Sequence, residues 1–192
     1  MTEAIPHTSA AFYECFEPVF GVVSGDLPQL ERLVGRVPRW RCLFPTGSLS
    51  FAFATSARAA TLWPQMPGEF RLLISWNRDL EQAFGGEEVS LFQYTSDADV
   101  CDYAAHQRRA LQKFLNHAGN ANRRELFPYT ADATWLPRAT DDEWCYYFDV
   151  DDVREWAEWY RRMLPEWIDR FAQLPESRAS WTRRVLSARR AR

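Results

Sequence analysis

The sequence predicts an α+β fold in which two long amphipathic helices pack on a mainly antiparallel sheet of five or six strands. Several short segments alternate large apolar residues with small or polar ones, which is the two-residue period of a strand. Two longer segments repeat apolar residues at three- and four-residue steps, which is the period of a helix. With 46% hydrophobic residues, the 192-residue chain can bury a full core without metal or disulfide support.

The clearest stretch is residues 143–174. Residues 144–149 alternate as a strand, with Trp144, Tyr146 and Phe148 on one face. The period then changes, and the apolar residues that share a helix face are Val153, Trp156, Tyr160, Met163, Leu164, Trp167, Ile168 and Phe171. We expect Asp151 or Asp152 to cap this helix, and Pro165 to bend it without ending it, because the apolar stripe continues in phase.

The N-terminal part is interpreted as a strand followed by a helix. Residues 11–23 fit either structure, and Pro18 together with the Val and Phe content favours a strand. The next segment, residues 27–34, predicts a helix with Asp26 as its N-cap, Pro28 in its first turn and Gly35 after its end.

Four more strands are predicted, at residues 40–44, 48–55, 69–76 and 88–95. The strand at 48–55 separates large from small side chains, with Leu49, Phe51 and Phe53 on one face and Ser50, Ala52 and Ala54 on the other. A short helix at residues 78–84 is expected to end at Gly85-Gly86. The four strands and residues 144–149 are expected to form the sheet.

The first long helix is expected to start at Ser96. Asp97 and Asp99 fall in its first turn and basic residues in its later turns, which is the charge order that the helix dipole favours. Residues 119–142 then show no sustained period, and irregular connections of this length are often functional. We expect one domain over residues 1–174 and an Arg-rich C-terminal tail over residues 175–192.

The net charge of −3 is unevenly distributed. Residues 175–192 contain six Arg and one Glu, a charge of +5, so residues 1–174 carry −8. An acidic body attracts a basic protein partner and repels nucleic acid. No apolar run is long enough to span a membrane, and the first residues do not resemble a secretory signal. Four scattered cysteines are expected to be free, buried thiols, so the expected location is cytoplasmic.

Residues capable of chemistry form no recognisable motif. His106 and His117 lie about 16 Å apart along one helix, so they cannot bind one metal together, and each is expected to be an exposed helix histidine. Carboxylates cluster at Asp97, Asp99 and Asp102 and again at 141–152, where Mg²⁺ binding competes with the simpler role of helix capping. We predict no catalytic residue, no metal and no cofactor, and the balance leans away from an enzyme.

Two segments carry apolar residues that suit a binding surface. Trp63 directly precedes Pro64, Met66 lies between Pro64 and Pro67, and Trp135 lies in the irregular connection. A stiff Trp-containing loop loses little entropy on binding, although the same residues could fold back over the core. We predict partner binding by Trp63, Met66 and Trp135 as apolar anchors, with Asp141 and Asp142 as acidic contacts.

In composition the chain resembles compact, acidic, Trp-rich bacterial proteins that bind and neutralise a partner, a type that includes toxin-immunity proteins. This resemblance transfers no residues. It implies a small cytoplasmic protein-binding module, an immunity or inhibitor protein that neutralises a basic toxin. Two alternatives remain: a metal-dependent hydrolase that uses Asp97/Asp99 or Asp141/Asp142, and a nucleic-acid-associated protein that acts through its Arg-rich tail.

Overall fold

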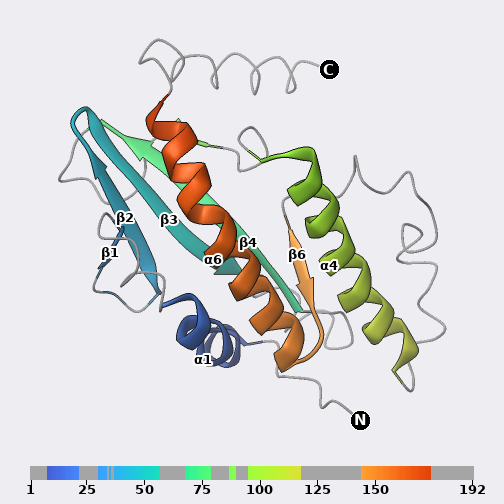
Figure 1. Cartoon of the computed structure of the whole chain (residues 1–192). Coiled ribbons are helices and arrows are strands. Elements are labelled where there is room, and N and C mark those ends of the chain that lie inside the picture. Colours follow the sequence, from blue (N-terminus) through green and yellow to red (C-terminus); the bar gives the residue numbers. More distant parts are fainter. Residues whose placement is uncertain are drawn as a thin grey trace, which may run out of the picture.

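The computed structural model describes residues 8–21, 30–33, 35, 37–56, 68–78, 87–89, 95–117 and 144–173. Within these ranges the chain forms a six-stranded antiparallel sheet and three helices, α1 (Ser9–Phe20), α4 (Asp97–Asn116) and α6 (Val150–Ala172) (Figure 1). The α+β class predicted from the sequence is therefore confirmed, and so are the two long helices. None of the described helices has both the length and the apolar composition needed to span a bilayer.

The sheet is built from a meander with two short strands added at one edge. β1 (Leu30–Leu33), β2 (Arg39–Phe44), β3 (Gly47–Thr55) and β4 (Gly68–Asn77) follow one another in space as in sequence. The outer edge of β4 pairs with β5 (Glu87–Glu88) near one end and with β6 (Cys145–Tyr147) near the other. β6 therefore joins the sheet next to the start of β4, directly before the chain enters α6.

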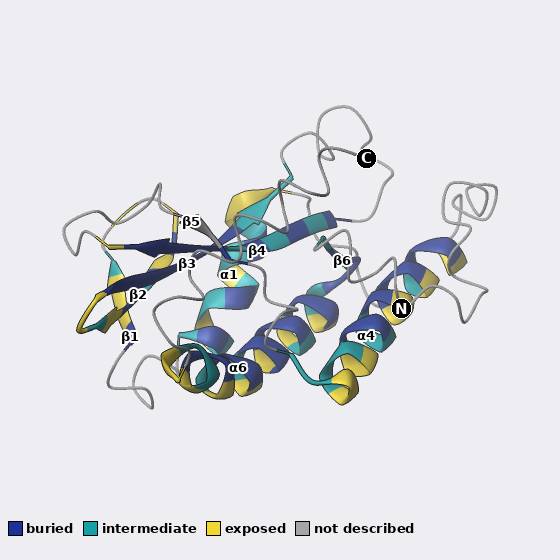
Figure 2. Ribbon diagram, turned by 90° about the horizontal axis from the view of Figure 1, so that it is seen from above, coloured by how far each residue is buried: buried dark blue, intermediate teal, exposed yellow. Residues whose placement is uncertain are grey.

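All three helices cover the same face of the sheet, with α6 between α1 and α4 (Figure 2). Phe53 of β3 joins the layers. Its ring centroid lies 4.4 Å from that of Phe16 in α1 and 5.1 Å from that of Tyr160 in α6. The predicted apolar stripe of α6 is confirmed: every member is buried except Phe171, which is partly buried. Each such side chain contributes about 1.5–3 kcal/mol when buried.

The strand predicted for residues 11–23 is wrong, because residues 9–20 form α1. Thr8 caps this helix, and Phe12, Phe16 and Phe20 recur every four residues and are all buried. Pro18 lies inside this helix, two residues before its end, and without an N–H it omits one backbone hydrogen bond of the last turn. The four-residue apolar spacing thus outweighs the strand propensity of the Val and Phe residues.

The helix predicted for residues 27–34 is wrong where the structure describes it, since Leu30–Leu33 is strand β1. It pairs with β2, Leu30 opposite Cys42, and Leu30 is 4% exposed in the core. Arg32 Nε also donates to Glu17 of α1 at 2.7 Å. Long-range pairing with β2 therefore overrides the local helix signal. Asp26 and Pro28 lie outside the described residues.

Other boundaries shift by a few residues. Asp149, not Asp151 or Asp152, is the N-cap of α6, and Asp152 completes a capping box with it. The helix continues through Pro165 as predicted. Of the strand expected at 88–95, the structure describes residues 88, 89 and 95. Glu88 belongs to strand β5 (Glu87–Glu88), whereas Val89 and Thr95 lie outside any strand. The helix expected at 78–84 and the tail at 175–192 lie outside the described residues.

The face of the sheet away from the helices is unusually polar at its centre. Ser48 and Asn77 are paired across β3 and β4, as are Ser50 and Ser75. All four are buried, and none of their side-chain oxygen or nitrogen atoms has a hydrogen-bond partner among the described residues. The sequence predicted small side chains on this face of β3, and that pattern is confirmed.

Candidate functional site

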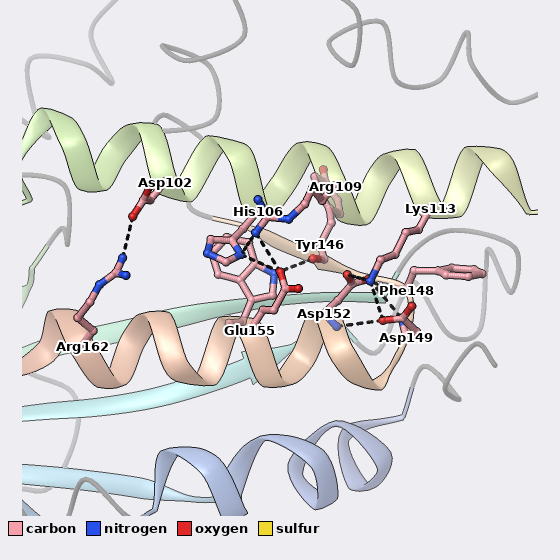
Figure 3. Close-up of polar contacts among 11 residues, drawn as sticks. Asp102, His106, Arg109, Lys113, Tyr146, Phe148, Asp149, Asp152, Glu155 and Arg162 are labelled. Carbon is pink, nitrogen blue, oxygen red and sulfur yellow. Dashed lines mark hydrogen bonds and ion pairs between the residues drawn. The ribbon is translucent and has the colours of Figure 1, made fainter. Parts of the chain in front are cut away.

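Within the described residues, a series of ionisable side chains lies along the seam between α4 and α6 (Figure 3). Three groups of contacts follow one another down the two helices. Asp102 pairs with Arg162, His106 and Arg109 meet Glu155, and Lys113 meets Asp149 and Asp152. The helical spacing of residues 102, 106, 109 and 113 places all four on one side of α4, facing α6.

The Lys113 group is the most buried of the three. Lys113 Nζ lies 2.7 Å from Asp152 Oδ1 and 3.1 Å from Asp149 Oδ1, and these carboxylates are only 2% and 1% exposed. Asp152 Oδ2 also accepts from the backbone N–H groups of Phe148 and Asp149. This cluster therefore fixes the start of α6 against α4.

The pKa values in this group follow from burial and from the shared hydrogen bonds. Burial raises the pKa of Asp152, although Lys113 and the Phe148 N–H oppose the rise. Burial alone would lower the pKa of Lys113, but its hydrogen bonds to Asp152 and Asp149 outweigh this effect and raise it. The ammonium is thus held charged beside the two carboxylates.

The middle group forms a triangle of three polar atoms. Arg109 Nη2 lies 2.7 Å from His106 Nδ1 and 2.9 Å from Glu155 Oε2, and the last two atoms are 3.3 Å apart. The imidazole also packs on Trp156, with 5.1 Å between ring centroids. His106 is therefore half-buried, so the prediction of an exposed histidine is wrong here. It is confirmed for His117, which is exposed.

A buried hydrogen-bond network links α4 to β6. The Gln107 side chain accepts from Tyr146 N at 2.6 Å and donates to the carbonyl oxygen of Trp144. Tyr103 donates to the same carbonyl at 3.1 Å. Gln107 thus supplies to β6 the donor and acceptor that a neighbouring strand would have supplied.

The cysteines are all free, as predicted, but only Cys42 and Cys145 are buried; Cys15 is half-buried and Cys101 is exposed. The Cys145 thiol lies 3.2 Å from the Tyr160 hydroxyl and 3.5 Å from the Tyr103 hydroxyl. Burial, with a smaller effect from Asp169, raises the pKa of Cys42 to about 11, so this thiol stays protonated at neutral pH.

The five predicted partner-binding residues, Trp63, Met66, Trp135, Asp141 and Asp142, lie outside the described residues. Of the carboxylates considered as metal ligands, Asp97 and Asp99 occupy the first turn of α4, and Ser96 caps it and bonds to Asp99. Among the described side chains, no three His, Cys, Asp or Glu groups converge as metal ligands would.

Sequence reasoning missed the seam and the Gln107 network. One signal was present: Gln107 interrupts the apolar face of α4, four residues after Tyr103, and a polar residue in that position indicates a buried hydrogen bond. Trp159 was missed as well. Its buried ring contacts Tyr103, so α6 has a second buried side that faces α4.

Comparisons with protein-family models, with curated proteins and with solved structures find no match. Function therefore has to be argued from the residues themselves.

Proposed function

We propose that the chain is a protein-binding module that holds and neutralises a partner protein, as an immunity or inhibitor protein does. The observation that supports this proposal is a line of acidic side chains on the exposed side of α6, consisting of Asp151, Glu158 and Asp169. All three are exposed, and no ion-pair partner for them occurs among the described residues. We call these three residues the acidic line.

The spacing of the acidic line follows from the helix period. Its members are seven and eleven residues apart, which is close to two and three turns, so they point to the same side over about 27 Å. Exposed charges of one sign raise the local concentration of an oppositely charged partner and speed its association, and the exposed Arg154 between Asp151 and Glu158 offsets part of this effect. A basic protein is therefore the expected partner.

The ionisable groups of the seam have a different role. Lys113, Asp149 and Asp152 are joined at the start of α6, and His106, Arg109 and Glu155 are joined in its middle. These contacts hold the helices together. The acidic line leaves its charge facing solvent, where it can act on another molecule.

The proposed anchors are still those predicted from the sequence. Trp63, Met66 and Trp135 would supply the apolar contacts, and Asp141 and Asp142 further acidic ones. In this division of roles the acidic line speeds association, whereas the Trp residues slow dissociation, since aromatic anchors carry much of the binding energy at interfaces.

The test uses two double variants with equal change in net charge, measured against the purified partner. Glu158→Gln with Asp169→Asn neutralises part of the acidic line. Glu31→Gln with Glu69→Gln neutralises two carboxylates on the face of the sheet away from the helices. We expect the first to slow association several-fold at low salt and the second to change it little. Equal effects would contradict a role for the acidic line.

A companion measurement tests the anchors. Trp63→Ala is expected to speed dissociation while leaving the association rate constant nearly unchanged. Affinity that stays unchanged both in Trp63→Ala and in the double variant Asp141→Ala/Asp142→Ala would show that these residues do not contact the partner.

A further inference from the structure

The triangle of His106, Arg109 and Glu155 cannot satisfy all three of its contacts in one protonation state. Arg109 can only donate, so its 2.7 Å contact with His106 Nδ1 requires Nδ1 to be an acceptor without a proton. The 3.3 Å contact between Nδ1 and Glu155 Oε2 requires the reverse, because a carboxylate only accepts. His106 Nδ1 therefore has two partners that require opposite protonation states.

The neutral state is the one that suits the observed distances. Arg109 Nη2 carries two hydrogen atoms, so it can donate one to His106 Nδ1 and the other to Glu155 Oε2 at 2.9 Å. If Nδ1 takes up a proton, its N–H points at the Arg109 N–H from 2.7 Å, which is repulsive both sterically and electrostatically. The protonated ring can instead donate to Glu155.

The groups around the His106 imidazole restrict how it can move when it takes up a proton. The imidazole packs on Trp156, whose indole N–H donates to the Tyr146 carbonyl at 2.8 Å, so the ring has a fixed support. Arg109 is half exposed and is free to swing toward solvent. Asp102, one turn earlier on α4, is paired with Arg162 of α6. The movable member of the triangle is therefore Arg109.

We propose that His106 is a proton-dependent switch in the α4–α6 seam. In its neutral form Arg109 bridges His106 and Glu155; on protonation His106 donates directly to Glu155 and Arg109 leaves the seam. The added proton comes from solvent and stays on Nδ1, so one Nδ1–H···Oε2 bond forms while both Arg109 bonds, to His106 Nδ1 and to Glu155 Oε2, are exchanged for bonds to solvent. The switch does not depend on the proposed function.

Burial, together with the neighbouring Arg109, lowers the pKa of His106 from its ordinary value. Burial is the main cause that lowers the pKa of His106, and the Arg109 cation lowers it further, whereas Glu155 and Asp102 oppose them. The unfolded chain then takes up this proton at higher pH than the folded chain does. The contribution of neutral His106 to the free energy of unfolding is therefore fully present above pH 6.5. It is lost as the pH falls from 6.5 through the lowered pKa of the folded chain.

The test is an NMR titration of the full chain that follows the His106 ring and the Arg109 side-chain N–H signals together. We expect both to change with one midpoint. Arg109→Gln should tighten proton binding at His106 by roughly three- to tenfold, since it removes the competing donor and its charge. Glu155→Gln should weaken proton binding, since it removes the acceptor.

Arg108→Gln is the matched control. It removes the same charge from the neighbouring, exposed position on α4 and should move the His106 midpoint much less than Arg109→Gln does. Equal shifts in the two variants would overturn the switch, because they would reduce the effect of Arg109 to general electrostatics. An Arg109 signal that does not change through the His106 midpoint in the wild-type chain would overturn it as well.

Discussion

Replacing Lys113 by Met tests how the start of α6 is held. The substitution keeps a side chain of similar length but removes the ammonium group that lies 2.7 Å from Asp152 and 3.1 Å from Asp149. Two carboxylates that are nearly inaccessible to solvent then lose their only cation among the described residues. Their desolvation is no longer offset, so the folded state loses stability.

The loss in free energy of unfolding caused by Lys113→Met follows from how deeply the ion pair is buried. Breaking a buried ion pair costs about 3–5 kcal/mol, and the Lys113 side chain is 36% exposed, which reduces this to about 2–3 kcal/mol. For a chain of this length, that corresponds to a fall in Tm of about 4–12 °C. Arg162→Met is the control, because the pair of Arg162 with Asp102 is exposed on both sides and should contribute at most about 1 kcal/mol.

Urea unfolding of both variants gives the comparison directly. The double variant Lys113→Met/Asp152→Asn should recover at least about 1 kcal/mol, because it removes the uncompensated charge and keeps an acceptor for Phe148 N–H. The defect of Lys113→Met should also shrink at acid pH, since the pKa of Asp152 is raised and its protonation removes the charge. A loss no larger than that of Arg162→Met would refute the reasoning.

Three further substitutions test the packing of the sheet. Gln107→Leu should cost about 1–3 kcal/mol and speed hydrogen exchange of the Tyr146 amide, because that N–H loses its acceptor; an unchanged exchange rate would argue against the network. Gly68→Ala should cost about 1–3 kcal/mol in thermal unfolding, since an added Cβ would overlap the ring of Tyr147. Ser50→Ala should leave stability unchanged or raise it by up to about 1 kcal/mol, because its hydroxyl is buried without a partner among the described residues; a clear loss would show that the hydroxyl bonds to another group.

The sequence was most informative where one element's own periodicity decides its structure. The stripe from Val153 to Ile168 predicted α6 and its buried face, and Ser96 predicted the start of α4. Alternation at residues 48–55 and 69–76 predicted β3 and β4. In each case the pattern is long enough for the apolar period to outweigh single-residue propensities.

The predictions were wrong where contacts with distant segments determine the local secondary structure. β1 has four residues and is a strand because β2 pairs with it, and nothing within residues 30–33 specifies that partner. In α1 the error was a predicted strand that is a helix. Pro18 suggested the strand, but three Phe residues packed on Phe53 and Phe70 stabilise the helix. Propensity is a weak guide when tertiary contacts compete with it.

The seam could be anticipated only in part. Asp97, Asp99 and the later basic residues of α4 suggested dipole interactions, yet Lys113 instead bridges to carboxylates 36 and 39 residues further along the chain. Asp149 and Asp152 were considered as possible metal ligands, and capping proved to be their role. Which helix faces which requires the three-dimensional arrangement, so His106 and Glu155 could not be paired from the sequence.

The central claim is that this chain binds a protein, and the most direct test is capture with a tagged full-length chain from the cells that produce it, at low and moderate salt. The retained protein is then purified and recombined with wild-type chain and with the Glu158→Gln/Asp169→Asn variant. We predict one stoichiometric, basic partner whose association slows with added salt and with the variant. A chain that remains a monomer without a partner at both salt concentrations would contradict the claim.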